Sequence, residues 1–235
     1  MKKVKVCDND ELEIWKHETK EDCLNIEFKH GLSSNIHSLF KSLLKTNILS
    51  RTIISSDKTL LTFKAHSIRQ FYPFHSNSSP FSMKYELCAN LIYFLTTQLE
   101  FLITNEKKCF YKLIPSNIFI IDNSKFVYLS NDYLLDIHEN NKMTICCPFP
   151  KDTHLDSPEL LEIVSIPTEI HYKTIYYSLA SLVLYFLNIN NEEQLLESTN
   201  IKKLEGIKIL EGTKLFYLLK RCLHSVAEKR SILFV

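Results

Sequence analysis

The sequence predicts an α+β fold in which a small β-rich lobe with one helix precedes a larger, mainly helical lobe. Short segments with alternating apolar residues fill the N-terminal part, whereas apolar residues recur at helical spacing further on. A polar, proline-containing stretch separates the two patterns. We therefore expect a first lobe over residues 1–72, a connector over 73–83 and a second lobe over 84–235, which together form one domain.

The first lobe is expected to be a small sheet with one helix. Alternation is clearest where Leu24, Ile26 and Phe28 point to one face. A helix is expected over residues 33–49, with Ser33 or Ser34 as its N-cap. Its apolar stripe consists of Ile36, Leu39, Phe40, Leu43 and Leu44. The expected strands cover residues 3–7, 12–18, 23–30, 51–57 and 58–66.

The second lobe begins with a long helix over residues 83–105. A hairpin follows, then a less regular segment over residues 132–153, and the rest is expected to be mostly helical. The apolar run over residues 178–187 is about half as long as a membrane span requires, so a buried helix is expected there. One face of the long helix carries Leu87, Leu91, Phe94, Leu95, Leu99 and Leu102.

Composition excludes several classes of function. The 28 basic and 27 acidic side chains leave a net charge of +1, with the lysines spread along the chain, so we expect neither a nucleic-acid nor a membrane partner. The N-terminus has no apolar signal segment, which favours an intracellular, cytoplasmic protein with free thiols. Abundant Ile, Asn and Lys suggest an AT-rich genome.

Cysteine, histidine and glycine give no sign of a metal or phosphate site. The seven cysteines contain no C-x-x-C pair, and the nine histidines have no metal-binding spacing. Cys146 and Cys147 lack a recognisable catalytic partner. The chain contains three glycines in all, too few for a Gly-rich phosphate loop.

Five short motifs follow one another in the second half of the chain. They are FYKLIPSNIFI (110–120), LSNDYLL (129–135), SPELLE (157–162), YYSLASLVLYFLN (176–188) and KRCLHSVAEKR (220–230). Their order and spacing resemble the catalytic loop, D-F-G turn, A-P-E motif, buried helix and closing signature of the protein kinase superfamily. The resemblance covers nearly the whole chain and implies a two-lobed, protein-kinase-like fold.

The resemblance places changed residues at the catalytic positions. Lys112 stands where an active kinase has its catalytic aspartate, and an ammonium cannot accept the substrate's proton. Asn117 and Asn131 stand at the metal-binding positions, and a neutral amide is a weak ligand for Mg²⁺. Asp132 lies one position later, and a shifted alignment would restore a carboxylate there.

The first lobe departs further from the family pattern. Lys29 matches the lysine that holds the nucleotide phosphates, but the following helix has no glutamate to pair with it, and Lys41 lies near that position. The architecture is better kept, since Glu159 and Arg230 match a buried structural ion pair.

These substitutions predict a pseudokinase that needs no cofactor and acts by binding a protein partner, such as an active kinase. Two alternatives remain open. One is a divergent phosphotransferase that uses ATP and Mg²⁺ through Lys29, Asn117 and Asp132. The other is an unrelated α+β interaction domain in which the Pro-Ser-Asn stretch is simply a turn before a strand.

Overall fold

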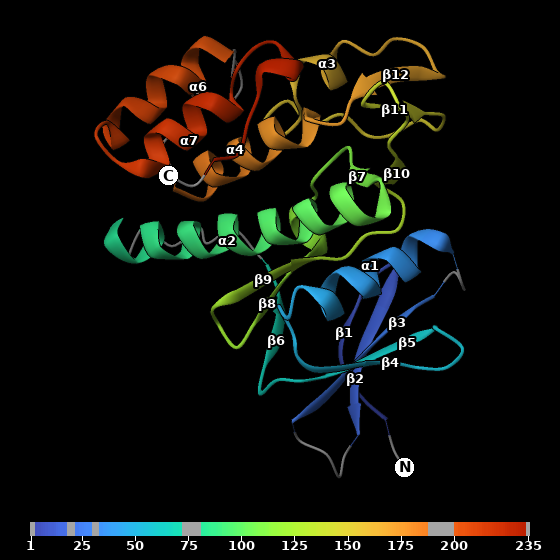
Figure 1. Ribbon diagram of the computed structural model, residues 1–235. Coiled ribbons are helices and arrows are strands. Elements are labelled where there is room, and N and C mark those ends of the chain that lie inside the picture. Colours follow the sequence, from blue (N-terminus) through green and yellow to red (C-terminus); the bar gives the residue numbers. More distant parts are fainter. Residues whose placement is uncertain (1–2, 18–21, 30–32, 72–80, 188–199, 234–235) are drawn as a thin grey trace. The chain divides into compact units, whose positions relative to one another are not determined.

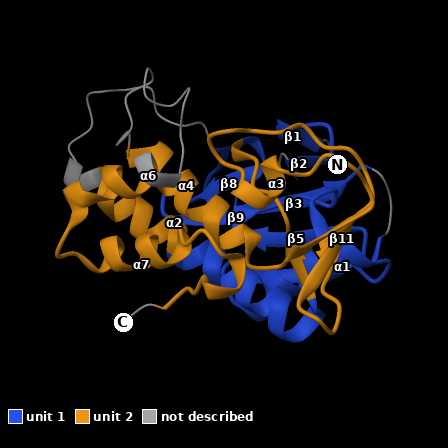
Figure 2. Ribbon diagram, turned by 90° about the horizontal axis from the view of Figure 1, so that it is seen from above, with its two compact units in different colours: residues 1–72, 93–107, 116–134 blue, residues 73–92, 108–115, 135–235 orange. Residues whose placement is uncertain are grey.

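The computed structural model describes residues 3–17, 22–29, 33–71, 81–187 and 200–233 (Figure 1). The chain divides into two compact units, which Figure 2 colours separately. Unit 1 comprises residues 1–72, 93–107 and 116–134, and unit 2 comprises residues 73–92, 108–115 and 135–235. The connector predicted over residues 73–83 lies mostly outside the described residues, so the predicted domain boundaries stay a prediction.

Unit 1 contains a five-stranded antiparallel sheet with strand order β1-β2-β3-β5-β4. All five strands expected from the sequence form, although their ends differ by a few residues. The alternation seen at Leu24, Ile26 and Phe28 places these three side chains in the core. The strands are β1 (Lys3–Asp8), β2 (Leu12–His17), β3 (Cys23–Phe28), β4 (Ser50–Ile54) and β5 (Leu60–Lys64).

Helix α1 (Ser34–Lys45) lies between β3 and β4 in the chain. Ser33 is its N-cap, because the Ser33 side chain accepts a hydrogen bond from the backbone N–H of Ile36. Phe40 packs against Phe28 with ring centroids 5.9 Å apart, which fixes the helix on the sheet. The buried apolar residues of the helix are Ile36, Leu39, Phe40 and Leu43.

A second sheet in unit 1 has strand order β6-β8-β9. Its strands are β6 (Ile68–Gln70), β8 (Ile118–Ile121) and β9 (Lys125–Tyr128). Asp122, Asn123 and Ser124 join β8 to β9. Asp122 and Asn123 have φ values of 49° and 58°, and the Ser124 N–H donates to the Ile121 carbonyl at 3.2 Å, as in a type I′ turn. The sequence pattern did not indicate β6, whose three residues are too few to show alternation.

Helix α2 (Phe81–Phe101) continues into a π-helical turn, η1 (Leu102–Glu106). The long helix expected over residues 83–105 therefore forms, and its residues belong to both units. The stretch Lys84–Glu106 is long and apolar enough to cross a membrane by length and composition, a criterion that a core helix also meets. Gln98 is buried, and its amide bonds both backbone polar groups of Tyr128 in β9.

Unit 2 is mainly helical but contains two small sheets. Strand β7 (Lys108–Phe110) pairs with β10 (Leu134–Asp136), and β11 (Lys142–Ile145) pairs with β12 (Thr168–His171). The sequence pattern missed β11 and β12, because strands of four residues are stabilised by their partners rather than by local preference. The other elements of unit 2 are η2 (Pro115–Asn117), which extends into unit 1, α3 (Pro158–Leu161), α4 (Thr174–Leu187), α6 (Asn200–Gly206), η3 (Ile207–Leu210), α7 (Lys214–Cys222) and η4 (Ala227–Lys229).

Candidate functional site

The candidate site lies in unit 1 and begins at the turn between β1 and β2. The Asn9 side-chain oxygen accepts hydrogen bonds from the backbone N–H groups of Glu11, at 3.0 Å, and Leu12, at 2.8 Å. Asparagine is a frequent turn former because its side chain can imitate a backbone acceptor in this way. The turn is thereby fixed, and it presents Glu11 as a buried side chain with 8% of its surface exposed.

Both carboxylate oxygens of Glu11 accept hydrogen bonds. Oε1 accepts from Asn117 Nδ2 at 2.7 Å and from the Ser130 hydroxyl at 2.8 Å. Oε2 accepts from the backbone N–H of Asn131 at 2.6 Å. Hydrogen bonds to an ionised acceptor are about twice as strong as neutral ones, and three donors surround this carboxylate. The arrangement is an anion site that the chain fills with its own side chain.

The register of the β8–β9 hairpin brings the three donors together. Asn117 ends η2 just before β8, whereas Ser130 and Asn131 follow β9. In the antiparallel pair the first residue of β8 lies opposite the last residue of β9. The backbone N–H of Leu129 accordingly donates to the Asn117 carbonyl at 2.9 Å. Residues far apart in the sequence thus converge on one point at the end of the hairpin.

The N-terminal end of α1 fixes Asn131 from another side. The Ser33 hydroxyl, which caps α1, donates to Asn131 Oδ1 at 2.6 Å. Asn35 donates to the backbone carbonyls of Asn131, at 3.3 Å, and Leu134, at 2.8 Å. Asp132 is exposed and contacts the Asn131 amide at 3.2 Å. Asp132 therefore belongs to the rim of the Glu11 network, which it meets through Asn131.

Asn117 and Asn131, which the resemblance places at metal-binding positions, do not fit Mg²⁺ in this arrangement. A hard cation needs oxygen ligands that point towards it. Here the oxygen that Asn131 would offer already accepts from Ser33, and the Asn117 oxygen faces the amide of Asn9 at 3.4 Å. N–H and O–H donors surround the carboxylate of Glu11, which is the polarity that an anion requires.

Lys29 is engaged elsewhere. Its ammonium lies 2.6 Å from Asp8 Oδ1, and both side chains are substantially exposed. The hydrogen bond from Lys29 is the main reason that the pKa of Asp8 is lowered. Lys41 of α1, near the position of the missing glutamate, instead pairs with Glu106 at 3.2 Å. Within unit 1, the lysine predicted to bind nucleotide is one partner of a surface ion pair.

Lys112 is buried in unit 2 and also has a carboxylate partner. Its ammonium lies 2.9 Å from Asp156 Oδ2 and donates to the backbone carbonyl of Pro150. Burial raises the pKa of Asp156, although the hydrogen bonds from Asp152 and Lys112 oppose this effect. Lys112, which the resemblance places at the position of the catalytic base, therefore serves as the cation of a buried ion pair.

Glu159 and Arg230 form the bidentate pair expected of their positions in the resemblance. The two terminal guanidinium nitrogens donate to the two carboxylate oxygens, at 2.9 Å for Nη2 and Oε2. Burial alone would raise the pKa of Glu159, but the bonds and charge of Arg230, with the hydroxyl of Thr174, outweigh it and lower the pKa. Arg230 is fully buried beneath the ring of Tyr177.

Sequence reasoning placed Asn117 and Asn131 in one site, and the structure joins them through Glu11. It missed Glu11, because no motif relates this turn residue to Asn117 or Asn131. It also missed Asp156 as the partner of Lys112, because no motif relates the two positions.

The described residues contain no other arrangement that suggests a metal or redox site. No group of three or more His, Cys, Asp or Glu side chains in the described ranges lies close enough to hold a metal ion. The cysteines, all of which lie in described segments, form no disulfide. Cys109 and Cys222 are buried, and burial raises the pKa of both thiols, so neither is poised as a nucleophile.

Comparisons with known proteins identify the fold but no family. No family model matches the sequence, and no curated protein matches it. Among solved structures, the crystal structure of a rhoptry kinase from Toxoplasma gondii is similar, with a TM-score of 0.54 and 11% sequence identity. The match covers 98% of this chain and 74% of the rhoptry kinase chain. The chain therefore has a protein-kinase-like fold.

Proposed function

We propose that this chain is a kinase-like protein that does not transfer phosphate and that acts by binding another protein. The observation that carries the proposal is the Glu11 network. A phosphate that approached Asn117, Ser130 and Asn131 would meet a buried negative charge already bonded to the same donors. Phosphoryl transfer depends on positioned phosphates and Mg²⁺, and this site favours neither.

The residue at the position of the catalytic base supports the same proposal. A general base must hold a free lone pair within reach of the substrate hydroxyl. Lys112 is an ammonium whose charge is balanced by Asp156, and it is 3% exposed. A protein with this fold and without this chemistry can still act by binding another protein through its surface. The proposed role is therefore a protein–protein one, such as docking on an active kinase to block or position it.

A thermal-shift titration with ATP and ADP, with and without Mg²⁺ and Mn²⁺, tests the proposal. We expect no shift, whereas a ligand at a hundred times its dissociation constant would add about 2.7 kcal/mol of stability. An active protein kinase titrated in parallel shows that the assay detects nucleotide. Robust phosphoryl transfer, or a metal-dependent shift that is lost in Asp132→Ala and Lys29→Ala, would overturn the proposal in favour of a divergent phosphotransferase.

A further inference from the structure

Unit 2 contains an apolar groove, which is lined by the start of α2 and by α7. The groove has a volume of about 520 Å³, within the range of sites that bind ligands. Helix α2 contributes one face at helical spacing, and α7 contributes a matching face. The residues that form this apolar groove are Tyr85, Ala89 and Ile92 from α2 and Leu215, Tyr217 and Leu218 from α7.

The rim of the apolar groove exposes large apolar side chains to solvent. Tyr217 is 53% exposed, and Leu233, which also lines the groove, is 56% exposed. Burying apolar surface is favourable, so an occupant with an apolar face would be stabilised here. Contiguous exposed apolar surface with a polar rim is typical of protein interaction sites.

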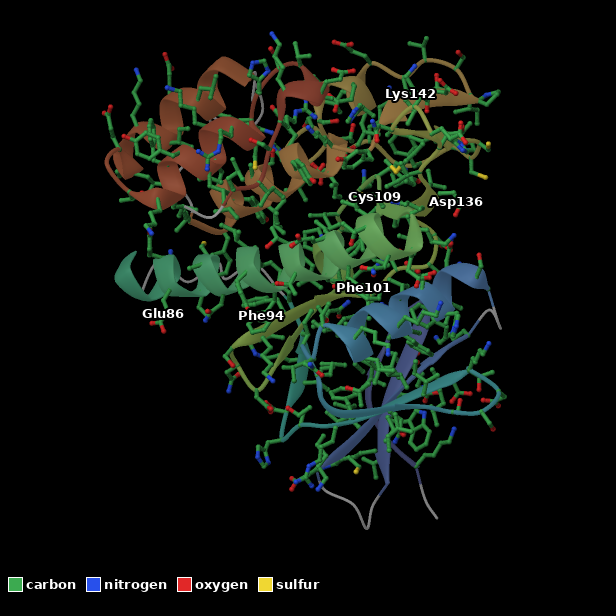
Figure 3. All side chains as sticks on the ribbon, viewed as in Figure 1. Glu86, Phe94, Phe101, Cys109, Asp136 and Lys142 are labelled. Carbon is green, nitrogen blue, oxygen red and sulfur yellow. The ribbon has the colours of Figure 1, made fainter. Side chains whose placement is uncertain are left out.

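The charged residues of the groove all have one sign. Among the described residues that line it, Lys214 and Arg221 are charged and none is acidic. The nearby acid on α2 is Glu86, and Figure 3 labels it on the side of α2 away from α7. A groove with an apolar floor and a cationic rim complements an occupant that carries carboxylates beside its apolar residues.

The position of Lys214 is informative, because α7 itself does not favour a cation there. Lys214 is the first residue of α7, directly after the N-cap Thr213. The positive end of the helix dipole disfavours a positive side chain at this position and attracts an anion. No carboxylate of the described residues forms an ion pair with Lys214. The exposed ammonium and the helix N-terminus therefore add their attraction for an acidic group at this end of the groove.

Arg221, seven residues further along α7, marks the other end. Its Nη2 donates to the Leu233 carbonyl at 2.7 Å, which holds the C-terminal segment beside the groove. Its Nε is buried and has no hydrogen-bond partner among the described residues. The guanidinium at this end of the groove therefore has hydrogen-bonding capacity that the described residues do not use.

We propose that the apolar groove binds an amphipathic helix of a partner protein. The apolar residues of that helix enter between α2 and α7, and its Asp or Glu side chains face Lys214 and Arg221. Recognition of a helix by apolar anchors about one turn apart is a common mode of protein binding. The inference rests on the proposed function only in that both assign the protein a protein partner.

Selection from a displayed library of random amphipathic helices, each about four turns long, tests the proposal on the full chain. We expect enriched peptides to carry apolar residues at i, i+4 and i+7 with flanking acids. Ala89→Trp, which fills the groove, should weaken the binding of the enriched peptides at least tenfold. The matched control Tyr93→Trp places the same side chain on α2 outside the groove and should leave their binding unchanged.

Charge-reversal variants test the electrostatic contribution to binding. Lys214→Glu should weaken the binding of acidic peptides about fivefold, and more at low salt than at high salt, whereas Lys208→Glu outside the groove should have no effect. Enriched peptides without acids, equal binding to Ala89→Trp, or no enrichment would overturn the proposal. Binding to anionic lipid vesicles that Ala89→Trp abolishes would overturn it in favour of a membrane surface. Because no nucleotide is used, these outcomes are independent of the thermal-shift titration.

Discussion

Replacing Glu11 should destabilise the protein through the donors that it leaves behind. Glu11→Ala removes the acceptor of Asn117 Nδ2, Ser130 Oγ and the Asn131 N–H. A buried donor without a partner costs about 1–3 kcal/mol, and water that enters the vacated space keeps each cost near the lower end. Three unpaired donors then cost about 3–4 kcal/mol of stability. A small part of this loss is compensated, because the variant no longer has to bury the charge of the carboxylate. We expect a net loss of about 3 kcal/mol.

Urea unfolding of the wild type, Glu11→Ala and Glu13→Ala measures this loss. Glu13 lies two residues further on in β2 and forms a surface ion pair with Lys5, so its replacement should cost less than about 1 kcal/mol. Acetate should restore part of the stability of Glu11→Ala alone, by about 1.4 kcal/mol at ten times its dissociation constant. Chloride at the same ionic strength should not. Equal losses in the two variants would refute the network as described.

Three further predictions concern buried charges in unit 2, each measured by urea unfolding. Arg230→Met should cost about 3 kcal/mol by removing a fully buried guanidinium and leaving the partly buried Glu159 without its partner, and adding Glu159→Gln should recover part of that loss. Burial lowers the pKa of Lys203 from 10.5 to about 8, so between these values the unfolded chain binds the proton that the folded chain has released. Stability from this group therefore rises with pH across that window by up to about 3 kcal/mol, and Lys203→Met should abolish the rise. Lys112→Asp should destabilise more than Lys112→Met, because it sets a second carboxylate against Asp156, and equal losses would contradict the ion pair.

The parts of the fold that local pattern determines could be predicted from the sequence. Strand β3 and helix α1 each show their own period, and Ser33 is a cap because of chemistry within four residues. Strands β6, β11 and β12 have three or four residues each, and their pairing depends on distant segments. No local pattern marks such strands.

Only part of the candidate site could be predicted from the sequence. Motif order placed Asn117 and Asn131 in one site, because a motif preserves position even when the residue changes. The identity of their partner depends on how a turn near the N-terminus meets a hairpin more than a hundred residues later, which the sequence does not reveal. Sequence reasoning missed Asp156 as well, because the need for a carboxylate partner arises only from the burial of Lys112, which the sequence does not show.

The Glu11 network also constrains the order in which the chain folds. Glu11 bonds Ser130 and Asn131 across 119 and 120 residues of sequence. During synthesis the β1–β2 hairpin leaves the ribosome long before these partners exist, at about 5–20 residues per second. Until then the Glu11 carboxylate has water as its partner, so the turn cannot adopt its buried position. Closure of this loop carries the entropy cost of a long-range contact, so we expect this step to follow formation of the β1–β2 hairpin.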